Sequence, residues 1–324
     1  MVVMSSLRVD RLVLPPQGAP LPEDGVMACL HAADGLAIRA AFWPAKPGAA
    51  ARGTVLLLQG RAEFIEKYAE TIARLTLSGF HVASVDWRGQ GGSARQLHNP
   101  RKGHVEDFED YQLDLDAIIR AMRDREMPQP WLLLSHSMGG AIALGALARG
   151  PSPFRRAVLC APLVKVANLW SEGAARVLAR GLAGLGFSAA FVPGGSGTSI
   201  SEEPFATNRL TQDAARYAHA QALLEAEPAL AIGDPTIGWV DAMFAHLQAF
   251  DAPDFGAAIT TPILMLLAGA DRVVDTPAAA RLAARLRAAS AIEIPAARHE
   301  IMMERDDLQH LFWRGAEAFF GIMP

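Results

Sequence analysis

The chain has 324 residues, 51% of them hydrophobic, which is enough for one large core with a smaller lobe attached. Charged residues make up 20% of the chain and the formal net charge is −4, so the composition argues against disorder and gives no reason to expect a nucleic-acid partner. Cys29 and Cys160 lie far apart in apolar runs, where we expect reduced and buried thiols. No His or Cys spacing predicts a metal site, and we expect no cofactor.

Residues 1–25 predict an N-terminal extension in which Arg8, Asp10 and Arg11 interrupt the apolar residues. No apolar run with a cleavage site follows, so we expect a cytoplasmic protein. Residues 131–148 carry no charge and reach the minimum length of a membrane span, about 18 residues. The Ser, His and Gly residues in the middle of this stretch instead predict a buried strand that runs into a buried helix.

Strands and helices alternate along most of the chain. An antiparallel pair is predicted first, at 26–30 and 36–42, with the turn Asp34-Gly35 between its strands. Further strands are predicted at 54–58, 81–85, 131–134, 157–160, 263–268 and 291–294, and helices at 63–78, 105–123, 138–148, 277–287 and 306–320. This order predicts an α/β fold with a mostly parallel, doubly wound sheet.

The alternation stops between residues 163 and 250. This stretch is rich in Ala, Leu and Gly, shows no strand pattern, and predicts helices with loops at 193–197 and 233–238. We therefore predict a helical cap at 163–250, inserted into a single core that consists of 26–162 and 251–324.

The strongest chemical signal is LLLSHSMGGAIAL at residues 132–144. A strand, a sharp turn and a helix in this order are typical of a nucleophile elbow. In such an elbow, one small residue lies two positions before the nucleophile and another lies two positions after it. Ser135 and Gly139 are those small residues, so Ser137 is the predicted nucleophile. Ser135 departs from the usual Gly. The turn also directs the N–H of Met138 and the positive end of the helix toward the same point.

A serine hydroxyl needs a base, and the base needs an acid to orient it. Of nine histidines, His299 follows the last predicted strand in a short loop, at the sheet edge toward which the elbow points. Asp271 is the first acid after the strand 263–268, and Asp275 is a weaker alternative close to a helix start. The loop after the strand that follows the elbow, 161–165, contains no acid. The order Ser137, Asp271, His299 is the one expected for an elbow of this kind.

The loop after strand 54–58 supplies the second predicted oxyanion donor. Gly60 allows close approach of the backbone, and we predict the N–H groups of Arg61 and Met138 as the donor pair. The glycine-rich segment 86–93 lacks phosphate-binding spacing and is interpreted as a tight loop that supports the site.

These motifs resemble the monoacylglycerol lipase and lysophospholipase group of α/β hydrolases, and most closely its bacterial lysophospholipase L2 type. The resemblance runs from about residue 26 to the C-terminus, and its motifs are Gln59-Gly60-Arg61-x-Glu63, Asp86-x-Arg88-Gly89-Gln90-Gly91-x-Ser93, His136-Ser137-Met138-Gly139-Gly140, Asp271 and His299. It implies the α/β-hydrolase fold, a hydrophobic acyl tunnel under the cap, and supporting roles for Gln59, Gly60, Glu63, His136 and Gly139. The group usually has His where this chain has Gln59 and Gln90, which leaves the substrate preference open.

The expected reaction is hydrolysis of a carboxylic ester of a single acyl chain, such as a lysophospholipid or monoacylglycerol. Thioester, lactone or carbon–carbon bond hydrolysis with the same triad is the alternative, and a binding module that kept the pocket is a weaker one. Trp170, Trp239 and Phe244, with Phe187 and Phe191, either line a substrate pocket or simply pack the cap. Acyl length, headgroup and oligomeric state are not predicted.

The sequence leaves two alternatives each for the Arg61 side chain and for the helical face near 174–191. Arg61 either meets a phosphate headgroup or pairs with Glu63 or Glu66 in solvent, and we expect the pairing. The uncharged helical face near 174–191 rests either on the core or on the inner membrane face, as a peripheral contact, and we expect the core.

Overall fold

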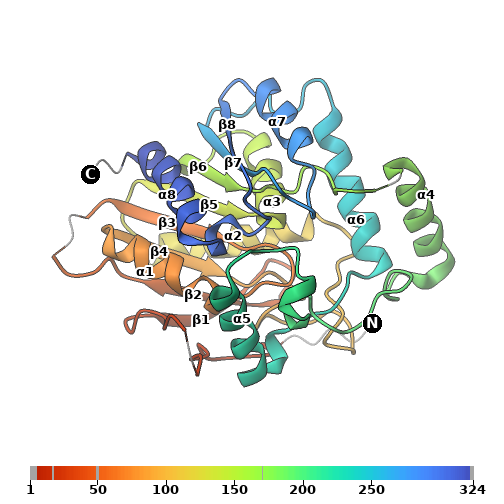
Figure 1. Cartoon of the computed structure of the whole chain (residues 1–324), viewed down its shortest axis with the longest axis horizontal. Coiled ribbons are helices and arrows are strands. Elements are labelled where there is room, and N and C mark those ends of the chain that lie inside the picture. Colours follow the sequence, from red (N-terminus) through yellow and green to blue (C-terminus); the bar gives the residue numbers. More distant parts are fainter. Residues whose placement is uncertain (1–5, 17, 49–50, 170, 322–324) are drawn as a thin grey trace.

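The computed structural model describes residues 6–16, 18–48, 51–169 and 171–321. Its centre is an eight-stranded sheet in the order β1-β2-β4-β3-β5-β6-β7-β8 (Figure 1). The strands are β1 (Val26–His31), β2 (Ala37–Trp43), β3 (Gly53–Leu58), β4 (Phe80–Val85), β5 (Trp131–His136), β6 (Phe154–Cys160), β7 (Ile263–Ala268) and β8 (Ala289–Ile294). β1 and β2 pair antiparallel, β2 joins β4 antiparallel, and the remaining pairs are parallel. The predicted mostly parallel sheet is confirmed.

Helices cover both faces of the sheet. α1 and α8 lie on the near face in Figure 1, and α2 and α3 lie behind it. The helices are α1 (Ala69–Leu77), α2 (Asp110–Asp124), α3 (Met138–Ala148), α4 (Glu172–Leu182), α5 (Ala214–Ala226), α6 (Ile237–Gln248), α7 (Thr276–Arg285) and α8 (Asp306–Phe320), with short turns η1 (Ile65–Tyr68), η2 (Ala183–Phe187), η3 (Ile200–Glu202), η4 (Phe205–Thr207), η5 (Pro228–Leu230), η6 (Ala249–Asp251) and η7 (Ile301–Met303). Every residue of β3 and β5 is buried, as continuous apolar runs covered on both faces require.

Two helices begin later than their periodicity predicts. The helix predicted from residue 105 begins at Asp110, because the Asp107 carboxylate accepts the N–H of Glu109 in a local turn. The helix predicted from residue 63 begins as the turn η1, because the N–H of Ile65 donates to the buried Asp86 carboxylate. In both places a side-chain acceptor replaces the first helical hydrogen bonds.

The segment predicted as the cap contains α4, α5 and α6, and no strand of the central sheet lies in its described part. α4 packs on α6, and both lie beyond the carboxyl ends of the strands (Figure 1). We propose that 163–250 is the cap of the core 26–162 and 251–324.

The first described residues form a strap that joins core and cap. Val9 and Val13 are buried in a small apolar cluster with Phe64, Leu223 and Leu224. Backbone groups of the strap bond to the core: the N–H of Val13 donates to Glu66, and the carbonyl of Arg11 accepts from Arg39. The Arg11 side chain also pairs with Glu227. Residues 6–13 are therefore packed structure, although the sequence suggested only an extension.

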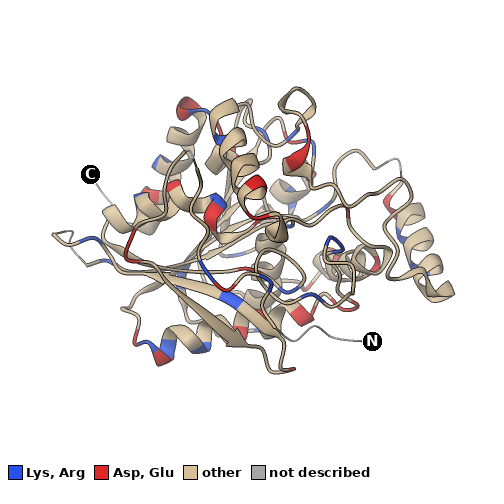
Figure 2. Cartoon of the chain, turned by 90° about the horizontal axis from the view of Figure 1, so that it is seen from below, with Lys and Arg blue, Asp and Glu red and all other residues tan. Residues whose placement is uncertain are grey.

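The prediction for the two thiols is half wrong. Cys160 is buried at the end of β6, but Cys29 is exposed on β1, because β1 is the edge strand of the sheet and pairs only with β2 in the described structure. In the described part of the chain, no helix has the length and apolarity to cross a membrane. Figure 2 shows Lys and Arg mixed with Asp and Glu along the chain.

Candidate active site

Ser137 occupies the sharp turn between β5 and α3. Its backbone has φ 49° and ψ −115°, a strained conformation for a residue other than glycine. A side chain at position 139 would place its Cβ 2.6 Å from the Gln59 carbonyl oxygen, so Gly139 is required for α3 to pack against the end of β3. The local geometry is that of a nucleophile elbow.

The structure brings Ser137, His299 and Asp271 together from three loops. His299 Nε2 lies 2.9 Å from Ser137 Oγ, and His299 Nδ1 lies 2.8 Å from Asp271 Oδ2. The loops follow β5, β8 and β7, whose carboxyl ends share one sheet edge. The side chains of His299 and Asp271 are 4% and 1% exposed, so little water competes for these bonds.

The Asp271 carboxylate is held ionised. Burial alone raises its pKa, but His299 and the N–H groups of Val273 and Val274 outweigh burial and lower it. The alternative acid, Asp275, instead caps α7 by accepting the N–H of Ala278. From the sequence, Asp271 could only be ranked ahead of Asp275. In the structure, Asp271 contacts His299 and Asp275 caps a helix.

The predicted oxyanion donors lie at the ends of β3 and β5. Met138 is the first residue of α3, where an N–H has no partner within the helix. Among the hydrogen bonds of the described residues, none uses the N–H of Met138 or of Arg61. Two unpaired N–H groups beside a nucleophile are suited to bind a developing oxyanion.

Glu63 holds the loop that carries Arg61. Its carboxylate accepts the N–H of Gly60 at 2.5 Å and the hydroxyl of Tyr68 at 2.6 Å. A Cβ at position 60 would lie 2.8 Å from this carboxylate, which is the structural reason for Gly60. Gln90 fixes the other side, because its amide N–H groups donate to the carbonyls of Gly60 and Glu63. Gln90 thus works as a bridge within the loop.

Gln59 has fewer bonds than Gln90. Its amide nitrogen lies 3.4 Å from Ser84 Oγ, and its side-chain oxygen is buried without a recorded partner in the described part of the chain. Its backbone carbonyl accepts the indole N–H of Trp87 at 2.9 Å. Its backbone therefore matters more to the site than its amide.

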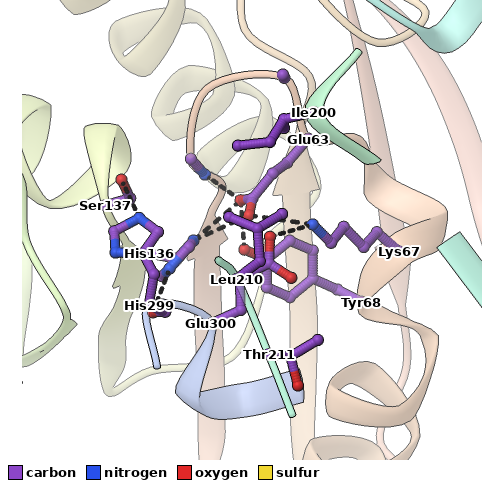
Figure 3. A network of polar contacts seen from close by, with 12 residues as sticks. Glu63, Lys67, Tyr68, His136, Ser137, Ile200, Leu210, Thr211, His299 and Glu300 are labelled. Carbon is purple, nitrogen blue, oxygen red and sulfur yellow. Dashed lines mark hydrogen bonds and ion pairs between the residues drawn. The ribbon is translucent and has the colours of Figure 1, made fainter. Parts of the chain in front are cut away.

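His136 joins this loop to the loop of His299. Its Nδ1 lies 3.1 Å from a Glu63 oxygen, and its Nε2 lies 3.1 Å from the backbone carbonyl oxygen of His299 (Figure 3). Both partners only accept hydrogen bonds, so both ring nitrogens must carry hydrogen and the imidazole is a cation. Although burial lowers the pKa of His136, the Glu63 carboxylate outweighs burial and raises it.

Lys67 completes the network. It lies 2.5 Å from Glu300 and 3.5 Å from Glu63, with a side chain only 4% exposed (Figure 3). Burial raises the pKa of Glu63, but His136 and Lys67 outweigh burial and lower it well below its usual range. Lys67, Tyr68 and Glu300 were not predicted from the sequence. The four-residue spacing of Glu63 and Lys67 was a weak signal for one of these contacts.

The family model described as serine aminopeptidase, S33, matches residues 49–306. The chain belongs to this family of α/β hydrolases. Lysophospholipase L2 of Escherichia coli (strain K12) is 33% identical over 283 residues, which cover 82% of this chain and 79% of that protein. Monoacylglycerol lipase of Mycolicibacterium smegmatis is 27% identical and covers 69% of this chain and 71% of its own length.

A solved structure supports the same fold. A soluble variant of monoglyceride lipase from Saccharomyces cerevisiae, in complex with a substrate analogue, has a TM-score of 0.72 at 18% identity and covers 93% of this chain and 98% of its own. The predicted α/β-hydrolase fold and the resemblance to the lysophospholipase and monoacylglycerol lipase group are confirmed.

This α/β hydrolase has a cavity of about 440 Å³ beside Ser137. Its walls are mainly apolar and come from both core and cap, and they include the candidates Trp239 and Phe244. Phe187, the last residue of η2, is 53% exposed, and neither Phe187 nor Phe191 is among the described residues that line the cavity. Trp170 lies outside the described residues.

The expected pairing of Arg61 is wrong. Glu63 is occupied by the network around His136, and Glu66 is paired with the buried Arg39 at 2.6 Å. Arg61 instead turns toward the cap, where it donates to the carbonyl of Gly233 at 2.9 Å and stacks 5.0 Å from the Trp239 ring centroid. The local sequence could not show this, because both partners are more than 150 residues away.

Proposed function

We propose that this chain hydrolyses the carboxylic ester of a single acyl chain, of the lysophospholipid or monoacylglycerol type, through an acyl-enzyme. The observation that carries the proposal is the hydrogen-bonded series Ser137–His299–Asp271 at the wall of an apolar cavity. Relatives that bear the names lysophospholipase L2 and monoacylglycerol lipase support this substrate class.

Each residue has a role that follows from its position. His299 Nε2 takes the Ser137 proton as Oγ attacks the ester carbonyl carbon, and Asp271 holds the ring and stabilises the resulting imidazolium. The N–H groups of Arg61 and Met138 bind the oxyanion. His299 then returns the proton to the leaving alcohol, and a water molecule releases the acid from Ser137 by the same steps in reverse order.

Labelling with an alkyl fluorophosphonate tests this function. We expect one label per chain in the intact protein and none in Ser137→Ala, with the fold checked by circular dichroism. Ester, thioester and lactone substrates of equal acyl length then separate the expected reaction from its alternatives. An intact protein that takes up no label would instead favour the binding module.

We also propose that the enzyme contacts a lipid surface through α4 and η2, on the cytoplasmic side of the membrane. The expected packing of this face on the core is wrong: Val177, Leu178 and Leu185 are 70%, 57% and 74% exposed, because α4 turns only part of its surface toward α6. Leu169, beside this face, is 39% exposed and also lines the cavity. An apolar face with arginines on the same helix and continuous with the cavity is suited to collect substrate from a bilayer.

Flotation with vesicles of phosphatidylethanolamine and phosphatidylglycerol tests this contact. We expect the double change Leu178→Asp and Leu185→Asp to reduce the bound fraction at least threefold, since each removes apolar area and adds an anion. Leu77→Asp is the matched control, because Leu77 is 68% exposed on α1, away from the cap. Equal binding of all variants would contradict the contact.

A further inference from the structure

The walls of the cavity are positively charged although the whole chain is acidic. Four Lys or Arg side chains and three carboxylates line it, whereas the chain carries −4. Lys67 is already neutralised by Glu63 and Glu300. The lining charges outside that network are Arg61, Arg209, Arg272 and Asp234. An excess of guanidinium groups beside the nucleophile favours an anionic ligand.

Of these three arginines, Arg61 is the one whose own backbone N–H is a candidate oxyanion donor. Its guanidinium makes no ion pair among the described residues, and its Nε is buried without an acceptor. Burial, with no paired carboxylate, lowers the pKa of Arg61 to about 10. Arg61 is partly buried, and no described carboxylate, Asp234 included, lies within ion-pairing distance of it, so an anionic group of the substrate would stabilise its guanidinium.

Arg209 and Arg272 add to this charge at the rim. Both are exposed, and neither makes an ion pair or hydrogen bond within the described part of the chain. They come from the loop before α5 and the loop after β7, so three separate segments direct arginines toward one cavity. Asp234 is partly satisfied by the N–H of Ser196 and makes no ion pair with any of them.

We propose that Arg61, with Arg209 and Arg272 at the rim, binds the phosphate of the substrate's alcohol portion, so that the enzyme selects lysophospholipids over uncharged monoacylglycerols. This inference rests on the proposed ester hydrolysis at Ser137. In a lysophospholipid the phosphate and the acyl ester share one glycerol, which places the anion a few bonds from the ester oxygen. Arginine matches phosphate by two parallel N–H donors.

The competing role for Arg61 is a purely structural clamp between the oxyanion loop and the cap. A clamp acts on every substrate equally, whereas a phosphate-binding residue acts on phosphate-bearing substrates alone. Arg61→Gln separates the two roles, because it removes the charge but keeps the backbone N–H. The substrates are a lysophosphatidylglycerol and a monoacylglycerol with the same acyl chain.

We expect Arg61→Gln to lower the ratio of kcat/KM for the lysophospholipid to kcat/KM for the monoacylglycerol about 10- to 100-fold, as for a lost hydrogen bond to a charged group. Arg61→Lys should recover part of the loss. Arg209→Gln and Arg272→Gln should cost about two- to threefold each, with an effect that salt weakens. Arg74→Gln is the matched control, since Arg74 stacks 4.9 Å from Trp313 outside the described lining of the cavity. Equal losses on both substrates would establish the clamp and overturn the proposal.

A second readout does not depend on turnover. Glycerol 3-phosphate should slow fluorophosphonate labelling of Ser137 in the intact protein, and glycerol should not. In Arg61→Gln this protection should require at least tenfold more glycerol 3-phosphate. If neither lipid is hydrolysed, the proposed function fails, and the protection experiment still decides the phosphate site: unchanged protection in Arg61→Gln would overturn it.

Discussion

Replacing Ser137 with alanine should lower kcat for ester hydrolysis by about 10⁵-fold or more. In the proposed mechanism the hydroxyl oxygen forms the acyl-enzyme, and no other side chain lies within hydrogen-bonding distance of His299 Nε2 among the described residues. The variant should keep its fold, because the helix α3 begins at Met138 and uses no side-chain cap from Ser137. Steady-state hydrolysis of a short-chain nitrophenyl ester measures the loss.

The three side chains should act as one unit. His299→Ala should cost about as much as Ser137→Ala, and the double variant should be no slower than either single variant, since each alone already prevents nucleophilic attack. Ser290→Ala, at an exposed position on β8, is the control. Losses that multiply in the double variant would show that the residues work separately, and would contradict the mechanism.

Glu63→Gln should lower both the stability and the turnover of the enzyme. The carboxylate is 5% exposed and is shared by Gly60, Tyr68, Lys67 and His136, so its loss leaves the His136 cation buried without a counterion. Breaking a buried pair of this kind typically costs about 3–5 kcal/mol of unfolding free energy. The loop that presents the N–H of Arg61 also loses its anchor at Gly60, so kcat should fall more than KM changes.

The pH dependence of the unfolding free energy tests the ion pair between Glu63 and His136. The pKa of Glu63 is lowered from 4.5, so its contribution is present above pH 4.5 and is lost as the pH falls through its folded pKa. The pKa of His136 is raised from 6.5, so its contribution is present below pH 6.5 and is lost as the pH rises through its folded pKa. The pair therefore stabilises the protein most between these two values.

Urea unfolding across this pH range is the measurement. In the intact protein the free energy of unfolding should fall on the alkaline side as His136 loses its proton, and in Glu63→Gln this alkaline fall should disappear. Glu225→Gln, at an exposed position on α5, should behave as the intact protein. An unchanged alkaline fall in Glu63→Gln would show that His136 is neutral in the native state.

Local patterns were sufficient to predict the sheet, the elbow at Ser137 and the candidates Asp271 and His299. β3 and β5 read as strands because each is a continuous apolar run, and the order of strands and helices makes parallel pairing the simplest arrangement. Parallel strands end at one edge, so residues that follow β5, β7 and β8 had to lie near one another. Helix starts were less certain, because distant acceptors such as Asp86 compete with the helix for backbone N–H groups.

The sequence by itself thus determined the fold class, the elbow and the order of Ser137, Asp271 and His299. Only the tertiary structure decided the partners of Arg61, the cationic state of His136, the exposed face of α4 and the burial of Val13. The physical reason is the separation along the chain of the residues that interact. Periodicity and turn chemistry act over a few residues, whereas these contacts join segments whose mutual position depends on how the whole core and cap pack.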